Sequence, residues 1–265
     1  MGSIASHEPR SAPRADLDRA RLYVAWQDSD SRAIEPVGRL DRLRGAGEVI
    51  YEFRYLLRSN RIDGFRPFLS FPDLNRIYRS KYLFPFFENR LMARSRADYA
   101  GFVRTLGLET DADPFEVLAR SEGRRQTDKI EVFPEPTIVG QAAQCHFLIH
   151  GVRHIPGADD AVDSLEIGDQ LFVLPDPQNP FDCHAVMLRD GNFHLLGWMP
   201  RHLTELIRGP LADIGPAAMD IRVEHIGARN GPIHLRVLCG LQVRWPEMRP
   251  WPFSGPEFEV IAARD

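Results

Sequence analysis

Three short stretches decide the fold of the second half of this chain: IGDQL at residues 167–171, NPFD at residues 179–182 and LGWMPR at residues 196–201. The middle stretch has the chemistry of a turn, because Asn and Asp side chains bond to nearby backbone groups and proline presets the backbone. Such a turn between two strands would hold an amide, an aromatic ring and a carboxylate at the rim of a small β domain. Turn formation alone explains these residues, and a ligand surface explains them as well, so both interpretations stay open.

Short strands with tight connections surround these stretches. The expected strands are residues 145–152, 170–174, 185–188, 193–198, 219–226 and 233–243. Residues 190–192 and 229–232 are Asn- and Gly-containing segments typical of hairpin connections. One helix is expected to begin after Pro200 and to end near Gly209 and Pro210. Short strands with a single interrupting helix predict a small, partly open β barrel.

The first half mixes strands and helices. The expected strands are residues 22–26, 48–55 and 129–133. Between them, Ser95 is placed to cap a helix that closes at Gly107, and Asp113 with Pro114 is typical of the start of a second helix. The first half is therefore predicted to be an α+β domain.

The domain limits follow from composition along the chain. Residues 1–20 are rich in Ser, Pro, Arg and Asp without apolar periodicity, which predicts a mobile arm. The α+β domain spans residues 21–134, and the stiff PEP sequence at residues 134–136 marks the boundary. The β barrel spans residues 141–243. The Pro- and Trp-rich tail at residues 244–265 is expected to lie extended over the domain surface.

Length and composition exclude several protein classes. A chain of 265 residues with 43% hydrophobic residues can bury a sizeable core, so a disordered or fibrous protein is not expected. Its apolar runs are shorter than the roughly 18 residues that span a bilayer, and residues 1–18 lack the apolar core of a signal peptide. Cys145, Cys183 and Cys239 are few and widely spaced, which argues against a disulfide framework. These features predict a cytoplasmic protein with reduced thiols.

Charge is unevenly distributed between the two halves. Residues 1–135 carry 23 Lys plus Arg against 21 Asp plus Glu, a net charge of +2, whereas residues 136–265 carry 10 against 16, a net charge of −6. The second half contains no lysine. Broad, sequence-blind binding of duplex DNA depends on many cations that displace counterions, so an acidic second half disfavours it. Any contact of this half with nucleic acid is expected to be local.

The predicted turn offers one place for such a local contact. Asn179, Phe181 and Asp182 would present hydrogen-bonding groups beside an aromatic ring. An unstacked base gains about 1–3 kcal/mol by stacking on an aromatic side chain. The turn is therefore a candidate seat for a single nucleobase.

A second group of candidate residues comes from two separate stretches of the sequence. Arg153 and His154 follow the first strand of the second half, and Trp198 and Arg201 flank the start of the helix at Pro200. A helix N-terminus offers unpaired backbone N–H groups and arginine offers a fork of donors. Each arginine alone is typical of a solvated surface. Together with the turn, this corner suits a phosphate or a terminal hydroxyl.

The order of these motifs resembles the HIRAN domain family. The matching stretches are GVRH at residues 151–154, IGDQL at 167–171, NPFD at 179–182 followed by Ala185 and Val186, and LGWMPR at 196–201. The resemblance covers about residues 141–243. It implies an OB-like β barrel that holds the 3′-hydroxyl end of single-stranded DNA.

The resemblance also implies roles for individual residues. Arg153 and His154 would flank the terminal nucleotides, and Arg201 would meet a phosphate. The pocket for the strand end would consist of the three turn residues Asn179, Phe181 and Asp182.

This chain departs from the family pattern at three of these positions. The family has tyrosine where His154 and Phe181 stand, and histidine where Trp198 stands. Both aromatic faces at the tyrosine positions remain, but two phenolic donors are missing. Stacking is therefore expected to persist, and the selection of a hydroxyl end is left to Asp182.

The first half resembles the N-terminal subdomain of HipA-type toxin kinases over about residues 21–134. The matching stretches are FPFFENRL at residues 84–91 and DPFEVLA at residues 113–119. In that family this subdomain packs on the kinase and does not transfer phosphate. The sequence has no Gly-rich phosphate loop and no HRD catalytic phrase, so no kinase activity is expected. The aromatic residues 78–87 are expected to be core, with exposed parts that dock a protein partner.

Other chemistry is not indicated by the sequence. Cys145 with His146, and Cys183 with His184, lack the closely spaced partner pairs of a zinc site, so buried thiols and strand histidines are favoured. An acidic cluster at residues 159–166 has ligands for a hard cation, but a solvated loop is favoured there. We expect no metal, no cofactor and no catalytic residues.

The sequence thus predicts an α+β N-terminal domain followed by a mainly β, OB-like small barrel with one or two helices. The predicted function is a non-enzymatic, bacterial-type DNA-binding adaptor. Its barrel would recognise single-stranded DNA 3′ ends or distorted DNA, and its first domain would dock a protein partner such as a HipA-type kinase or a repair or defence enzyme. The alternative is a protein-only regulator, similar to an antitoxin, that controls a HipA-type kinase without binding DNA. A nuclease or ATPase subunit is a weaker third interpretation.

Overall fold

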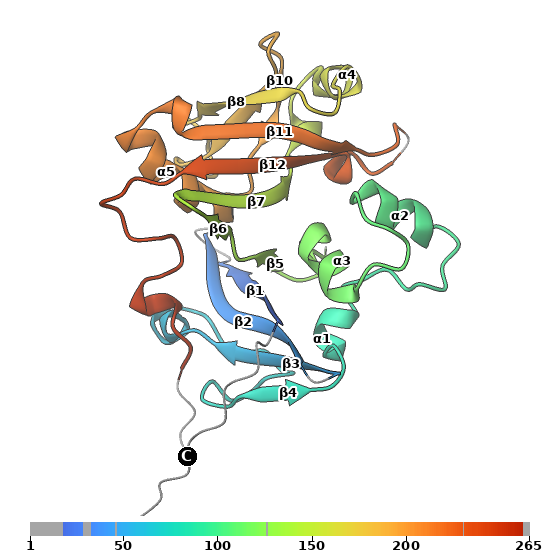
Figure 1. The fold of residues 1–265 in the computed structure, drawn as a ribbon, viewed down its shortest axis with the longest axis vertical. Helices are drawn as coiled ribbons and strands as arrows, with labels where there is room; N and C mark the ends of the chain where they lie inside the picture. The colour runs from blue at the N-terminus through green and yellow to red at the C-terminus, as the bar shows by residue number, and fades with distance from the viewer. Residues whose placement is uncertain (1–17, 29–32, 46, 126, 230, 262–265) are drawn as a thin grey trace, which may run out of the picture.

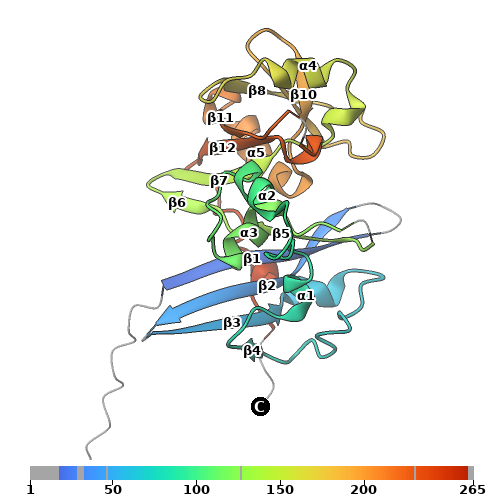
Figure 2. The same ribbon diagram turned by 90° about the vertical axis from the view of Figure 1, so that its right-hand side faces the viewer.

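The computed structural model describes residues 18–261, apart from residues 29–32, 46, 126 and 230. Two antiparallel sheets form the framework of the described chain, with helices around them (Figures 1 and 2). Most of the expected N-terminal arm lies outside the described residues, whereas residues 18–20 already belong to the first strand. No helix in the described part of the chain is long and apolar enough to cross a bilayer.

The first sheet has five strands in the order β4-β3-β2-β1-β5. Its strands are β1 (Asp18–Gln27), β2 (Ile34–Gly45), β3 (Glu48–Tyr55), β4 (Tyr78–Ser80) and β5 (Ile130–Pro134). The strands predicted at residues 22–26, 48–55 and 129–133 are present as parts of β1, β3 and β5. β2, which is rich in arginine, was not predicted from the sequence. Its Arg39 and Asp41 lie on one face of the sheet, and Leu40 lies on the other together with Arg42, which pairs with Asp113 at 2.8 Å.

Three helices accompany the first sheet (Figure 1). They are α1 (Pro85–Glu88), α2 (Tyr99–Thr105) and α3 (Pro114–Ser121). At α3 the predicted cap is confirmed, since the Asp113 side chain accepts a hydrogen bond from the Phe115 N–H at 2.8 Å. The cap predicted for α2 is wrong, because the helix starts four residues after Ser95 with Asp98 at its N-cap position. Asp98 makes a salt bridge with Arg96 and gives no side-chain cap.

The second sheet has seven strands in the order β10-β9-β8-β11-β12-β7-β6. Its strands are β6 (Thr137–Val139), β7 (Ala142–Leu148), β8 (Gln170–Pro175), β9 (Val186–Arg189), β10 (Leu195–Trp198), β11 (Met219–Ile226) and β12 (Val237–Arg244). All six strands predicted in this half are present, with limits shifted by a few residues in most cases. The tight connection of residues 190–192 joins β9 to β10, as predicted.

The second sheet does not close into a hydrogen-bonded barrel among the described strands. One isolated antiparallel bridge lies between His150, two residues after β7, and Trp198 in β10. The N–H of His150 donates to the Trp198 carbonyl at 2.9 Å, and the N–H of Trp198 donates to the His150 carbonyl at 2.8 Å. The structure therefore shows a small antiparallel β unit in which two hydrogen bonds bring β10 against the end of β7.

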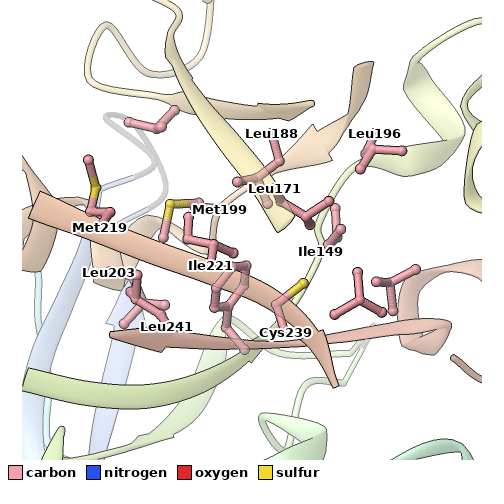
Figure 3. Packing of buried hydrophobic residues seen from close by; sticks show 14 of the residues in the cluster. Ile149, Leu171, Leu188, Leu196, Met199, Leu203, Met219, Ile221, Cys239 and Leu241 are labelled. Atoms are coloured by element: carbon pink, nitrogen blue, oxygen red, sulfur yellow. The ribbon is translucent and has the colours of Figure 1, made fainter. Parts of the chain in front are cut away.

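Apolar side chains from six strands and two helices fill the space inside the second sheet (Figure 3). The residues seen there include Leu171 of β8, Leu188 of β9, Leu196 of β10, Ile221 of β11, Cys239 and Leu241 of β12, and Leu203 of α5 (Arg201–Asp213). Leu188, Leu196 and Cys239 are fully buried. This core fixes the inner faces of β8, β9 and β10, so their alternate residues face outward.

Two helices of the second half differ from the sequence-based expectation. Helix α5 continues to Asp213 and contains Pro210, where an earlier end was predicted. Proline has no N–H to donate within the helix, but the helix continues past it, since its carbonyl accepts the N–H of Ile214 at 2.9 Å. The acidic stretch expected to be a loop forms helix α4 (Ala158–Asp163), which buries Ala158, Ala161 and Val162.

The C-terminal tail packs on the first sheet, which corrects the expectation that it lies extended over its own domain. Trp245 and Trp251 stack with ring centroids 5.6 Å apart, and the chain then crosses to β1. There Phe253 and Phe258 lie 5.1 and 5.9 Å from the ring of Tyr23. The tail therefore joins the two sheets (Figure 1), because it leaves β12, packs on Tyr23 of β1 and ends beside β3, where the Ile261 N–H donates to the Tyr55 carbonyl at 2.9 Å.

Candidate nucleic-acid site at the end of the second sheet

Side-chain hydrogen bonds shape the connection between β8 and β9. The Asn179 Oδ1 atom accepts the N–H groups of Phe181 and Asp182 at 3.0 and 3.2 Å, and the Asp182 Oδ1 atom accepts the N–H of His184 at 2.9 Å. The turn chemistry predicted for residues 179–182 is therefore present. Because these bonds hold the backbone, the Phe181 side chain stands at the surface with 64% of its area exposed.

Asp176 connects this turn to β10. Its Oδ2 atom accepts hydrogen bonds from the Asn179 Nδ2 and Trp198 Nε1 atoms, each at 3.0 Å. Asp176 was not predicted as a site residue. The sequence does contain a signal for it, because Asp176 precedes a proline, as Asn179 does, and lies three residues before Asn179. At this spacing the side chains of Asp and Asn reach nearby polar groups.

Arg201 closes the turn from the other side. Its Nε atom lies 2.8 Å from Asp182 Oδ2, and its Nη2 atom donates to the Phe181 carbonyl at 3.2 Å. Arg201 is the first residue of α5, and its N-cap residue Pro200 supplies no side-chain cap. The Asp182 carboxylate and the Arg201 guanidinium thus neutralise each other beside an uncapped helix N-terminus, where the dipole favours negative charge.

The Trp198 ring packs against Gly151, which follows His150 in the sequence. A Cβ atom added at Gly151 would lie 2.6 Å from the Trp198 ring, and the φ of Gly151 is +72°, in the region that favours glycine. The 3₁₀ turn η2 (Val152–His154) begins directly after this glycine and carries the exposed residues Arg153 and His154. The Arg153 Nε atom donates to the His154 Nε2 atom at 3.1 Å.

The structure brings together most of the residues predicted to form the site. Hydrogen bonds and one ion pair join Asn179, Phe181, Asp182 and Arg201 directly, and Asp176 joins Trp198 to Asn179. Arg153 and His154 bond to each other. They connect to this group through the backbone of residues 150 and 151, which holds Trp198.

Two residues of the first half support this arrangement and were missed by the sequence analysis. Glu122 follows α3 with a left-handed backbone, φ +58°, and its Oε2 atom lies 2.8 Å from the His150 Nε2 atom. The Arg124 Nη1 atom lies 3.3 Å from His150 Nδ1. No local motif announces these contacts, because 28 and 26 positions of sequence separate the partners.

The electrostatics of this contact favour an ionised carboxylate. Burial raises the pKa of Glu122, but the charge and hydrogen bond of His150, with His202 and Arg124, outweigh burial and hold it at about 2. Burial and the positive charges of Arg124, His150 and Arg153 lower the pKa of His234 in the same region. The cluster of Glu122, His150 and Arg124 thus lies where the two halves of the chain meet.

Two of the three cysteines are buried. These are Cys145 and Cys239, and burial raises the pKa of the Cys145 thiol to about 12, whereas Cys183 is exposed.

The acidic stretch forms ion pairs with arginines. Asp163 of α4 pairs with Arg236 at 2.6 Å and also with Arg229. Among the described residues, no group of three or more His, Cys, Asp or Glu side chains is placed to hold a metal ion.

Comparisons with known proteins give limited similarity. No family model and no curated protein matches the sequence. In structure, the chain is similar to a protein from Lactobacillus plantarum, with 15% identity and a TM-score of 0.30, covering 38% of this chain and 96% of that one. It is also similar to the HIRAN domain of human HLTF, with 17% identity and a TM-score of 0.28, covering 40% of this chain and 77% of that one.

Neither similarity is large enough to assign a family. One of these neighbours is a HIRAN domain, the family that the motifs of the second half resemble. The resemblance of residues 21–134 to HipA-type kinases has no support among these neighbours and stays a prediction, as does the division of the chain into domains near residue 134.

Proposed function

We propose that this chain is a non-enzymatic adaptor whose second half holds the 3′ end of single-stranded DNA. The observation that carries the proposal is the exposed ring of Phe181 on a turn that Asn179 holds through the backbone, next to the ion pair of Asp182 with Arg201. An aromatic face beside one acceptor and one cationic fork offers a terminal nucleotide a stacking surface, a partner for its hydroxyl and a partner for its phosphate.

Each residue has a distinct role in this proposal. The Phe181 ring stacks on the terminal base, Asp182 accepts the 3′-hydroxyl and Arg201 binds the nearest phosphate at the N-terminus of α5. Asp182 keeps this capacity although two contacts use its oxygens, since an ionised carboxylate has about four acceptor sites. Arg153 and His154 flank the next nucleotides. Asp176 and Trp198 position the turn.

The first half is proposed to dock a protein partner, such as a HipA-type kinase or a DNA-processing enzyme. Leu69 is 99% exposed and Tyr82 is 81% exposed, both in the segment that joins η1 (Leu57–Arg61) to α1. Large apolar side chains at such exposure are typical of contact surfaces when they lie together. An adaptor of this kind would bring its partner to damaged or invading DNA.

One observation favours the alternative of a protein-only regulator. The second half carries a net charge of −6, which opposes the approach of any nucleic acid at low salt. In this alternative Phe181 and its neighbours contact a protein, and the first half controls a separate kinase.

Fluorescence anisotropy with a short single strand that has a 3′-hydroxyl and a blocked 5′ end separates the two functions. Phe181→Ala is expected to weaken binding by roughly tenfold or more, because stacking contributes about 1–3 kcal/mol per base. Arg201→Ala is expected to weaken it as well. Phe193→Ala is the matched control, since Phe193 is 75% exposed on the hairpin between β9 and β10, where the Arg189 guanidinium lies 4.4 Å from its ring.

Unchanged affinity in Phe181→Ala would show that the stacking role is wrong. If the wild-type protein binds no form of DNA at about 50 mM salt, where phosphate contacts are strong, but co-purifies with a kinase, the protein-only regulator is the better account.

A further inference from the structure

One face of the first sheet is covered with arginine. In the register of the sheet, Arg21 of β1 lies opposite Asp41 of β2, Asp41 opposite Glu52 of β3, and Glu52 opposite Arg79 of β4. Residues directly opposite in antiparallel strands share a face, so these four form one row across four strands. Four strands at roughly 4.8 Å spacing make this row about 14 Å long.

Three more arginines belong to the same face. Arg19 is two residues from Arg21 along β1, and Arg39 of β2 lies opposite Arg54 of β3 in the neighbouring row. We call the surface of these side chains the arginine face. It consists of Arg19, Arg21, Arg39, Arg54 and Arg79 above Asp41 and Glu52.

The carboxylates lie beneath the guanidinium groups. Asp41 contacts Arg19 at 2.6 Å and both Arg21 and Arg39 at 3.0 Å. Glu52 contacts Arg79 at 2.8 Å and also Arg54. The side chain of Asp41 is 1% exposed and that of Glu52 is 2% exposed, against 41% for Arg19 and 63% for Arg79. Solvent therefore meets guanidinium groups on this face.

The face keeps a positive charge after its ion pairs are counted. Five arginines stand against two buried carboxylates and Glu135, which pairs with Arg21 at the rim at 2.8 Å, and this leaves a net charge of +2. The crowding of like charge is visible at Arg39. Burial and the positive charges of Arg21, Arg19 and Arg54 lower the pKa of its guanidinium despite Asp41.

The composition of the face indicates what kind of partner fits it. Interfaces between proteins depend on buried aromatic or aliphatic anchors, whereas contacts to nucleic-acid phosphates need cationic forks. None of the highly exposed large apolar residues in the described part of the chain belongs to β1, β2, β3 or β4. The cations that lie over Asp41 and Glu52 are all arginines, whereas Lys81 pairs with Glu48 at 3.1 Å at the start of β3. A planar fork matches a phosphate better than an ammonium group does.

A groove borders the face on one side. It has a volume of about 860 Å³ and is lined by Arg19, Arg21 and tail residues 251–254, among others. A chain that follows the row of arginines would enter or leave through this groove.

We propose that the arginine face binds the sugar–phosphate backbone of nucleic acid independently of strand ends. This surface goes beyond the end site of the second half, because it needs neither a free 3′ end nor an exposed base. It gives the protein a second, sequence-blind contact with the same ligand.

The probe that tests this surface is a covalently closed, circular single-stranded DNA, which has no end for the site at Phe181. Wild-type protein is expected to bind the circle at about 50 mM salt, with an affinity that falls as salt rises. The variant with both Arg19→Gln and Arg79→Gln should reduce the magnitude of the log–log salt slope by about 1.4, since each phosphate contact on a single strand contributes about 0.7. Asp41 keeps two arginines and Glu52 keeps Arg54 in this variant.

Two further variants make the result specific. The matched control has Arg96→Gln with Arg222→Gln, two arginines that are 60% and 52% exposed and are also paired with aspartates. It should leave the slope unchanged. Arg79→Gln alone should reduce the slope by about 0.7, which keeps the test informative if the double variant unfolds.

Several outcomes would overturn the arginine face as a binding surface. These are failure of the wild-type protein to bind the circle, an equal loss of slope in the control, or competition by poly-glutamate as strong as that by DNA of equal charge. Phe181→Ala should bind the circle like the wild type, so a failed end site and a failed arginine face are distinguishable.

Discussion

Glu122 and His150 join the two halves of the chain directly beside the candidate site. Their Oε2 and Nε2 atoms lie 2.8 Å apart, and the backbone of His150 holds Trp198 through two hydrogen bonds. A buried carboxylate of the first half therefore supports the segment that carries Arg153 and His154. The site belongs to both halves of the molecule, although the residues proposed to hold the strand end all lie in the second.

Replacing this carboxylate should destabilise the protein. Glu122→Ala leaves His150 and Arg124 without their shared acceptor, and losing a hydrogen bond to a charged group costs about 1.5–3 kcal/mol. Urea unfolding followed by circular dichroism measures the change. Glu109→Ala, which removes an exposed glutamate, is the control and should differ from wild type by less than about 0.5 kcal/mol. A similar small change in Glu122→Ala would show that the contact contributes little.

Acid should remove the contribution of Glu122. Its pKa in the folded protein is about 2, below the ordinary 4.5, so it stabilises the folded state above pH 4.5 and this stabilisation is lost as pH falls from about 4.5 to 2. The unfolding free energies of wild type and Glu122→Gln should therefore differ near neutral pH and converge as the pH approaches 2. His202, Glu131 and His234 also lie near this contact, so the comparison with the variant isolates Glu122. A difference that is constant with pH would contradict the shift.

Alanine substitutions at two glycines distinguish the cost of a steric clash from the cost of backbone strain. Gly151 and Gly157 both have left-handed backbones, φ +72° and +78°, but a Cβ atom added at Gly151 would lie 2.6 Å from the Trp198 ring, whereas one added at Gly157 would meet open space. Gly157→Ala should cost about 1 kcal/mol through strain alone. Gly151→Ala should cost more and should also change the near-UV circular dichroism of Trp198. Equal costs and unchanged spectra would mean that the tryptophan is not held against this turn.

The tail should stabilise a sheet that lies far from it in sequence. Phe258 packs 5.9 Å from Tyr23 and 5.2 Å from Phe253, so Phe258→Ala is expected to lower the unfolding free energy by about 1–3 kcal/mol. Hydrogen exchange at the amides of β1 should become faster. Met248→Ala is the control, because Met248 is 96% exposed. Unchanged exchange in β1 would show that the tail does not support the first sheet.

Local sequence signals predicted the strands of the second half and the turn at residues 179–182. Alternation of apolar residues, Asn and Gly in hairpin connections, and the Asx-Pro pair act over a few positions, and the structure has β11 at the predicted limits. The Asp113 cap was predictable for the same reason. The prediction that Ser95 caps a helix was wrong because serine alone does not fix where a helix begins. The chain turns again after Ser95, and the helix begins only at Tyr99.

Contacts between distant segments were not predictable from the sequence. The pairing of Glu122 with His150 and the packing of Phe258 on Tyr23 arise from the way the sheets meet. The arginine-rich strand β2 was missed because it carries arginines on both faces, and its charges are stabilised by distant partners. Asp41 pairs with Arg21, and Arg42 pairs with Asp113.

Selection between two strand ends tests the central claim most directly. Identical short single strands, one with a 3′-hydroxyl and one with a 3′-phosphate, are titrated against wild type and Asp182→Asn by anisotropy. Wild type should bind the hydroxyl end roughly tenfold more tightly, a difference of about 1.4 kcal/mol, because the carboxylate accepts a hydroxyl and repels a phosphate. Asp182→Asn should reduce this preference. Equal binding of both ends by wild type, or tighter binding of the phosphate, would contradict the end site.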